Sequence, residues 1–342
     1  MEQVTKSPRT LQEAIAYFAD SDRCFEYAKQ LRWPDGNVVC PRCGVAKNSF
    51  VKTRKLWFCY GCKKQFTIKV KTIMEDSPIR LDKWMAAFWM LANCRNGVSS
   101  HEMARTLGVT QTTAWFMLHR IREVMRSKPT KKMGSGGNSG GFEVDETYIG
   151  GTPKNMHAGR RRRHMMGRGT QYGYVAKTPV QGIFDRDMRQ VRAQMMPNVK
   201  RESLQEQVFN NIQFGSKVFT DSAVAYDKLK LGYVHEIVNH AERYVDGEIH
   251  TNGLENFWSL LKRTLRGTYV AVEPFHLDHY LDEQVFRFNN RKDGTRKISD
   301  SERFKTAMGQ VFGKRLTYAE LTGKNDSPRH ETTGTREENI PF

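Results

Sequence analysis

Residues 142–149 of this 342-residue chain have the sequence FEVDETYI, in which apolar and acidic side chains alternate before Gly150 and Gly151. Alternation with a period of two is typical of a β-strand that buries one face. A second strand-like run, residues 218–220, ends directly at Asp221. Carboxylates such as Asp145 and Asp221 at strand ends are well placed to share a divalent cation. These segments predict a mixed α/β domain with a candidate metal site.

A predicted helix over residues 251–265 adds a third acid, Glu255. Its apolar side chains lie on one side, whereas Glu255 and Lys262 lie two turns apart on the other, together with Arg266. Three acids fit two Mg²⁺ or Mn²⁺ ions, which activate a water or 3′-hydroxyl and stabilise the leaving oxygen in a displacement at phosphorus. The lysine is then suited to hold a phosphate.

A structural interpretation of the same acids stays open. Asn252 and Glu255 have the spacing of a helix capping box, and Asp145 and Asp221 are equally able to form structural ion pairs. The chain has no GxxxxGK[ST] motif, so ATP-driven chemistry has no support.

Further elements surround these acids. Strands are predicted at 174–184, 190–196 and 235–239, and helices at 201–212 and 277–290. The run GSGGNSGG at 134–141 cannot hold a fixed backbone and marks a domain boundary. The resulting division is a helical segment at 1–36, a cysteine-containing ribbon at 37–71, three helices within 80–130, the linker at 134–141, the α/β domain at 142–322 and a polar tail at 323–342.

Four cysteines form two CxxC motifs, separated by 15 residues, with Gly44 and Gly61 available for tight turns. Two such motifs bring four thiolates to one tetrahedral Zn²⁺, which a segment this small needs to hold its fold. Disulfides are disfavoured because nothing in the sequence indicates export. The predicted structural zinc ligands are Cys40, Cys43, Cys59 and Cys62.

Residues 98–126 have the pattern of a helix-turn-helix, with Gly108 in the turn and Thr110 as the cap of the second helix. The start of the second helix would face the DNA major groove, and basic residues further along would hold phosphates. An ordinary helical hairpin is the alternative. The predicted DNA contacts here are Gln111, Thr112, Thr113, Trp115, Arg120, Arg122 and Arg126.

The chain has a formal net charge of +18, and residues 51–200 hold the whole excess with 28 basic and 10 acidic side chains. Clustering of this kind favours nucleic acid as the partner over a dispersed, solvated surface. The run Arg160, Arg161, Arg162 and Arg163 is a candidate phosphate contact or a solvated loop. The longest apolar run, residues 84–94, is too short to span a membrane, so we expect a soluble, cytoplasmic protein associated with the nucleoid.

These motifs, in this order, resemble the bacterial insertion-sequence transposases of the DDE type that have an N-terminal zinc ribbon and an ISXO2-like transposase domain. The resemblance covers residues 33–291 and rests on CPRCG at 40–44, AWFMLHRIR at 114–122, VDETYIGG at 144–151, TD at 220–221, HTNGLENFWSLLKR at 250–263 and FRFNNR at 286–291. It implies an α+β multidomain protein in which the zinc ribbon and helix-turn-helix precede an RNase H-like catalytic domain. It further implies that Asp145, Asp221 and Glu255 bind metal, followed by Lys262.

Two features of this chain need comment in the light of the resemblance. Some members have Asn rather than Glu as the third residue, and Asn252 lies one turn before Glu255, so both are candidates and Glu255 is our choice. Relatives more often have a Gly-Thr pair where this chain has Lys69-Val70-Lys71-Thr72.

The implied function is a DNA transposase that binds the element's terminal inverted repeats, cleaves them and joins the 3′-hydroxyl ends to target DNA. Arg263 and Arg266 are further candidate DNA contacts. Joint cutting of two ends requires at least a homodimer. The alternatives are a zinc-ribbon and helix-turn-helix transcription regulator with a catalytically silent second domain, and a structure-selective nuclease that cleaves without joining.

Overall fold

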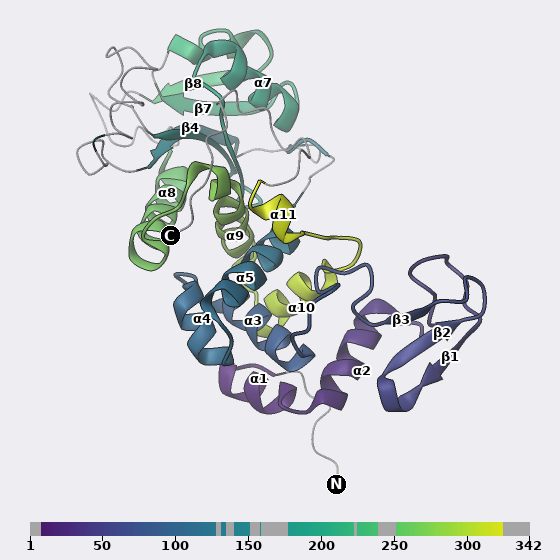
Figure 1. The fold of residues 1–342 in the computed structure, drawn as a ribbon. Helices are drawn as coiled ribbons and strands as arrows, with labels where there is room; N and C mark the ends of the chain where they lie inside the picture. The colour runs from purple at the N-terminus through teal and green to yellow at the C-terminus, as the bar shows by residue number, and fades with distance from the viewer. Residues whose placement is uncertain are drawn as a thin grey trace. The chain divides into compact units, whose positions relative to one another are not determined.

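A computed structural model describes residues 8–127, 131–134, 140–150, 158, 177–221, 224–238 and 251–323. The chain divides into two compact units. Unit 1 contains the described residues up to 127 together with residues 259–318, and unit 2 contains those from 131 to 258 together with 319–323 (Figure 1). The predicted linker at 134–141 and tail at 323–342 lie mostly outside the described residues.

Unit 1 is built on the apolar helix α3, in which Trp84, Phe88 and Trp89 are at most 1% exposed. Within the described ranges, no helix combines the length and the apolar character needed to cross a membrane. Phe304 of α10 packs against Trp89 and against Phe18 of α1, with ring centroids 5.3 and 5.2 Å apart. The main helices of unit 1 are α1 (Leu11–Phe18), α2 (Ser21–Arg32), α3 (Leu81–Asn93), α4 (Ser100–Leu107), α5 (Gln111–Met125), α9 (Leu277–Asn289) and α10 (Asp300–Gly309).

The ribbon of unit 1 is a three-stranded antiparallel sheet in the order β1 (Asn48–Val51), β2 (Leu56–Cys59) and β3 (Gln65–Thr67). Trp57 lies at its centre, 3% exposed, and stacks on Phe66 of β3 and Phe25 of α2. The aromatic side chain of Trp57 therefore packs the ribbon and is buried from any nucleic acid.

Unit 2 contains a five-stranded sheet in the order β6-β5-β4-β7-β8. The pairs of β4 with β5 and of β5 with β6 are antiparallel, whereas β7 is parallel to both β4 and β8. This is the mixed sheet expected of an RNase H-like domain, and it confirms the α+β multidomain fold class. Its elements are β4 (Phe142–Ile149), β5 (Thr178–Asp185), β6 (Gln190–Met195), α7 (Arg201–Asn211), β7 (Lys217–Asp221), β8 (Val234–Val238) and the start of α8 (Asn252–Thr264).

The two faces of this sheet pack against different helices. Phe142 and Val144 of β4 form a buried cluster with Leu204 and Val208 of α7. Because side chains alternate along a strand, the residues between them point to the opposite face, where the first turns of α8 lie (Figure 1). The alternation seen in residues 142–149 thus separates a hydrophobic core from a polar site.

The end of the predicted domain 142–322 differs from the observed division of the chain, because residues 259–318 pack with the N-terminal helices. Helix α9 packs on α5, and α10 packs on α3. The late helices α9 and α10 therefore pack against partners from the first third of the chain.

Candidate functional site

Asp145 and Asp221 lie at the same edge of the sheet because β4 and β7 are parallel neighbours. Glu143 is paired with Phe219 in the strand register, and each aspartate follows two residues later on its own strand. Both carboxylates are half-buried. The structure therefore brings together the first two acids that the sequence predicted, through strand pairing between segments far apart in the chain.

Helix α8 is attached to this face of β4 by two hydrogen bonds. The backbone N–H of Leu254 donates to Oε2 of Glu143 at 2.9 Å, and the indole Nε1–H of Trp258 donates to Oδ2 of Asp145 at 2.9 Å. Two glycines allow the close approach. A Cβ on Gly182 would lie 2.6 Å from the Trp258 ring, and one on Gly253 would lie 2.3 Å from the Phe184 ring.

Neither Glu143 nor Trp258 was predicted as a site residue. Glu143 is 1% exposed and also accepts a hydrogen bond from Arg186 Nε at 2.9 Å. The available signal for Glu143 was a charged side chain two residues before Asp145, on the same face of the strand. Trp258 lies among the apolar side chains of its helix, so the sequence gives no sign of the contact made by its N–H group.

Glu255 is exposed on the first turns of α8, where the hydroxyl of Thr251 donates to its Oε1 at 3.4 Å. Burial raises the pKa of Asp145 to about 6. The Trp258 hydrogen bond opposes this increase, and the negative charges of Asp221 and Glu255 add to it. The charges of the two other predicted acids therefore act on Asp145, as expected where a cation would be held near it.

Glu146 is a further acid at this strand end, on the core side of β4 beside Gln181 of β5. Burial, followed by the charges of Asp145 and Asp221, raises its pKa to about 8. Glu146 Oε1 and Gln181 Oε1 are both buried without a hydrogen-bond partner among the described residues. The hydrogen bond with the Gln181 side chain opposes this increase in the pKa of Glu146.

The four cysteines form the second site. The ligand atoms of Cys40, Cys43, Cys59 and Cys62 all lie within 4.8 Å of one another, a spacing that no other group of three or more potential ligands has in the described part of the chain. The Sγ atoms of Cys40 and Cys62 are 3.8 Å apart. Backbone N–H groups of Cys62 and Gly61 contribute to lowering the pKa of Cys59 to about 7. The cysteine cluster fits a structural Zn²⁺. The carboxylate oxygens of Asp145, Asp221 and Glu255 do not all lie within the same 4.8 Å of one another.

Each CxxC motif is followed directly by a residue in the left-handed conformation. Gly44 has a φ of 79°, but at the equivalent place after the second motif the left-handed residue is Lys63, with a φ of 57°. A Cβ on Gly61 would lie 2.8 Å from Val45 Cγ2. Gly61 lies in the turn at residues 60–62, as expected, and its missing side chain also lets the two motifs pack closely.

The exit from the ribbon contains a residue in the left-handed conformation. Lys71 has a φ of 54°, a conformation that glycine adopts without strain. Lys69 is partly buried, and its Nζ donates to the carbonyl oxygens of Ser77 and Ile79 at 3.0 and 2.5 Å.

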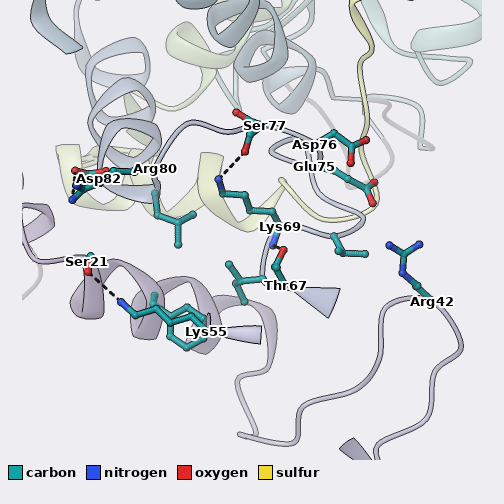
Figure 2. A pocket seen from close by; sticks show the side chains of 14 residues that line it. Ser21, Arg42, Lys55, Thr67, Lys69, Glu75, Asp76, Ser77, Arg80 and Asp82 are labelled. Carbon is teal, nitrogen blue, oxygen red and sulfur yellow. Dashed lines mark hydrogen bonds and ion pairs between the residues drawn. The ribbon is translucent and has the colours of Figure 1, made fainter. Parts of the chain in front are cut away.

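This segment borders a pocket of 480 Å³, into which Arg42, Lys55, Lys69 and Arg80 face (Figure 2). Three of these cations have partners within unit 1: Lys55 pairs with Asp22, Arg80 pairs with Asp82, and Lys69 binds the carbonyl oxygens. These contacts of the lining residues hold the ribbon against the rest of unit 1.

The helix-turn-helix forms as predicted. Ser99 caps α4 through the N–H of Glu102, Gly108 ends α4 with a φ of 59°, and the hydroxyl of Thr110 accepts from the N–H of Thr113 at the start of α5. Gln111 and Thr112 are exposed. The predicted recognition surface at the start of α5 is thus accessible.

Arg120 and Arg122 of α5, and Arg126 directly after it, all have partners within unit 1. Arg122 is 1% exposed and pairs with Glu283. Arg120 is 8% exposed and donates to the carbonyl oxygens of Leu316 and Glu75, and Arg126 pairs with Asp282. The expectation that Arg120 and Arg122 hold phosphates is not met, because Arg122 is buried against α9 and Arg120 is buried between the carbonyl groups of Glu75 and Leu316.

Trp115 is half-buried, and its ring contacts His119, His276 and Tyr318. These ring contacts account for the position of Trp115, and no contact with DNA is needed to explain it.

The remaining predicted DNA contacts are Arg263, Arg266 and the run 160–163. Arg263 and Arg266 are exposed. The run 160–163 lies outside the described residues.

Two family models match the chain. An ISXO2-like transposase domain matches residues 138–289, and a transposase zinc-ribbon domain matches residues 19–65. A protein in transposable element ISH50 of Halobacterium salinarum is 26% identical over 289 residues, which cover 80% of this chain and 94% of that protein. A transposase-like protein of Haemophilus influenzae is 31% identical over 97 residues, covering 28% of this chain and 78% of that protein. With its zinc ribbon, mixed sheet and strand-end acids in the matched regions, the chain belongs to the ISXO2-like transposase family.

Proposed function

We propose that this protein is a DNA transposase that binds the terminal repeats of an insertion sequence, cleaves them by metal-dependent phosphodiester hydrolysis and joins the 3′-hydroxyl ends to target DNA. The observation that supports this most is the position of Asp145 and Asp221 at matching ends of adjacent parallel strands, with the charge of Glu255 acting on Asp145. Family membership supplies the coarser conclusion, a transposase that acts on DNA.

Asp145, Asp221 and Glu255 would hold two Mg²⁺ or Mn²⁺ ions. Carboxylate oxygens are the ligands that these hard cations prefer, and the mutual repulsion of the acids favours a cation among them. When bound, two such ions activate the attacking water or 3′-hydroxyl and stabilise the leaving oxygen. Lys262, two turns along α8 from Glu255, would contact a phosphate oxygen of the DNA strand.

Glu255 is favoured over Asn252 as the third ligand. Both side chains are exposed at the start of α8. Only Glu255 has a charge, and this charge is among the causes that raise the pKa of Asp145. Because the carboxylate of Glu255 acts electrostatically on Asp145, it is suited to bind the same cation as Asp145.

DNA recognition would use the exposed start of α5 and the ribbon. Gln111, Thr112 and Thr113 are candidates for base contacts, and Arg263 and Arg266 for phosphate contacts. The run 160–163 remains a candidate from sequence alone. Because two element ends are processed together, the active form would be a homodimer or a larger assembly, working in the cytoplasm on nucleoid DNA.

The test is a strand-transfer assay with labelled terminal repeats and supercoiled target DNA in Mg²⁺. Asp145→Asn, Asp221→Asn and Glu255→Gln should each abolish cleavage and joining while end binding in a gel-shift assay persists. Asn252→Ala is the matched control on α8, and it should retain activity if Glu255 is the ligand.

The other outcomes identify the alternatives. Cleavage without any joined product would indicate a nuclease. Sequence-specific binding without cleavage would indicate a regulator. Full activity of an acid variant would remove that residue from the proposed site.

A further inference from the structure

The indole of Trp258 has an unusual partner for a residue on the apolar side of a helix. Trp258 is 4% exposed, and its Nε1–H is directed at Oδ2 of Asp145 across 2.9 Å. Its ring lies against Gly182 of β5, where a Cβ would come within 2.6 Å of Cζ2. The bare backbone at Gly182 therefore lets the ring reach the strand that holds Asp145.

We propose that Trp258 is a positioning residue for the carboxylate of Asp145, a role that rests on the proposed function. An indole N–H only donates hydrogen bonds, so Trp258 cannot itself ligate a cation. Its donor occupies one oxygen of Asp145 and restricts rotation of the carboxylate. Outer hydrogen bonds of this kind orient metal-ligating groups and strengthen metal binding.

A second hydrogen bond, one helical turn before Trp258 on α8, fixes the position of the indole. The N–H of Leu254 donates to Glu143, and Glu143 is held by Arg186. Glu143 and Asp145 are two residues apart on one face of β4, a distance of about 6.6 Å along a strand. Leu254 and Trp258 are four residues apart on α8, a distance of about 6 Å along a helix.

These two spacings nearly match, so both hydrogen bonds form in a single register of α8 on β4. A shift of the helix by one residue would break both. The same register brings Glu255, which directly follows Leu254, to the side of Asp145. Trp258 thus fixes the orientation of one acid, while its helix supplies another.

The experiment measures Mn²⁺ binding by electron paramagnetic resonance of the free ion, on the full chain loaded with zinc. Trp258→Phe keeps an aromatic ring and removes the N–H donor. Trp84→Phe is the matched control, because Trp84 is fully buried in α3 and its Nε1–H donates to Ser77 Oγ at 3.3 Å, away from the acids. Asp145→Asn reports whether the bound Mn²⁺ uses Asp145.

We expect Trp258→Phe to weaken Mn²⁺ binding about 10- to 100-fold, with DNA-end binding unchanged, and Trp84→Phe to bind Mn²⁺ like the wild type. If Trp258→Phe does not fold, 3-benzothienylalanine at position 258 replaces the N–H by sulfur in a ring of similar size, and the same weakening is expected.

Two failures are distinguishable. If Asp145→Asn loses Mn²⁺ but both changes at position 258 leave the affinity unaltered, the positioning role is overturned and the proposed function stands. If Asp145→Asn binds Mn²⁺ as tightly as the wild type, the metal does not use Asp145, and the proposed function fails together with the positioning role.

Discussion

Arg122 of α5 and Glu283 of α9 form an ion pair with 2.7 Å between Nε and Oε2, although 161 positions separate them in the chain. Both side chains are at most 1% exposed. Glu283 also accepts hydrogen bonds from Arg287 and from the hydroxyl of Tyr269. Burial alone would raise the pKa of Glu283, but the charges of Arg287 and Arg122 hold it below its usual value. This pair joins the helix-turn-helix to the late helices of unit 1.

Replacing Glu283 by Ala should therefore destabilise unit 1 strongly. Two buried arginines would lose their counter-charge, and breaking a buried pair on one side costs about 3–5 kcal/mol. Urea unfolding followed by circular dichroism measures the effect. Arg296→Ala, which breaks an exposed pair with Glu302, is the control and should leave the midpoint unchanged. Equal midpoints for the two variants would show that the buried pair has no net effect on stability.

Asp145→Asn should stabilise the protein at pH 7.5 while removing activity. The folded-state pKa of Asp145, about 6, lies above the usual aspartate value of 3.8. Between these two pH values the folded state binds a proton that the unfolded state has lost, so the free energy of unfolding falls as pH rises through this window. The full penalty above pH 6 is roughly 2–3 kcal/mol, from about 1.4 kcal/mol per pKa unit. Asparagine avoids this penalty.

The measurement is the unfolding free energy of wild type and Asp145→Asn from pH 4 to 8, with bound zinc and without other divalent cations. The difference should vanish near pH 4. A difference that does not change with pH would mean that burial of the Asp145 charge is not its cause.

Gly182→Ala should disturb the contact between α8 and the sheet. The new Cβ would lie 2.6 Å from Trp258 and 2.8 Å from Leu254 Cδ2. Overpacking of this kind costs about 1–3 kcal/mol, and displacement of the indole should weaken Mn²⁺ binding as well. Gly267→Ala, where the added Cβ meets no atom within 4 Å, is the matched control. Thermal unfolding and Mn²⁺ titration of both variants check this, and wild-type behaviour of Gly182→Ala would contradict the close approach.

Cys40→Ser should remove the zinc from the ribbon. A CxxC site that loses one thiolate binds the metal much more weakly, and a three-stranded ribbon depends on that metal for its fold. Zinc analysis should give one equivalent for the wild type and for Cys94→Ser, whose cysteine lies outside the cluster, and far less for Cys40→Ser. End binding should weaken while unit 2 stays folded. Zinc retained by Cys40→Ser would exclude it as a ligand.

Lys71→Gly should stabilise the exit from the ribbon. A non-glycine residue at φ 54° costs about 1–2 kcal/mol, and glycine offsets about 0.5–1 kcal/mol of that gain through its freedom in the unfolded chain. A net increase of about 0.5–1 kcal/mol is expected. Lys64→Gly, at a lysine of the ribbon that has no positive φ, should slightly destabilise the protein. The reverse order in thermal unfolding would contradict the strain at Lys71.

The strand-end acids and the cysteine cluster were predictable because their signals are local. Alternation in residues 142–149 separates Asp145 from the core residues Phe142 and Val144, and the CxxC spacing determines which thiols meet. The cap at Thr110 and the turn at Gly108 likewise depend on neighbouring residues alone.

The roles of the α5 arginines and of Trp258 were not predictable in this way. A basic helix face next to a helix-turn-helix has the same pattern whether it meets phosphates or buried acids. Arg122 meets Glu283, which no local pattern links to it. Trp258 has the hydrophobicity of a core residue, and only the fold shows that its one polar atom meets Asp145.

The division of unit 1 between residues up to 127 and residues 259–318 also has a consequence for synthesis on the ribosome. Arg122 emerges long before Glu283, and the apolar surface of α3 emerges long before α10. The core formed by α3 and α5 therefore stays incomplete while the sheet of unit 2 is translated. A messenger truncated before codon 259 would encode the strands and the three acids, together with α3 and α5 without their late partners. Only a polypeptide that extends past α10 can therefore complete the packing of α3 and α5.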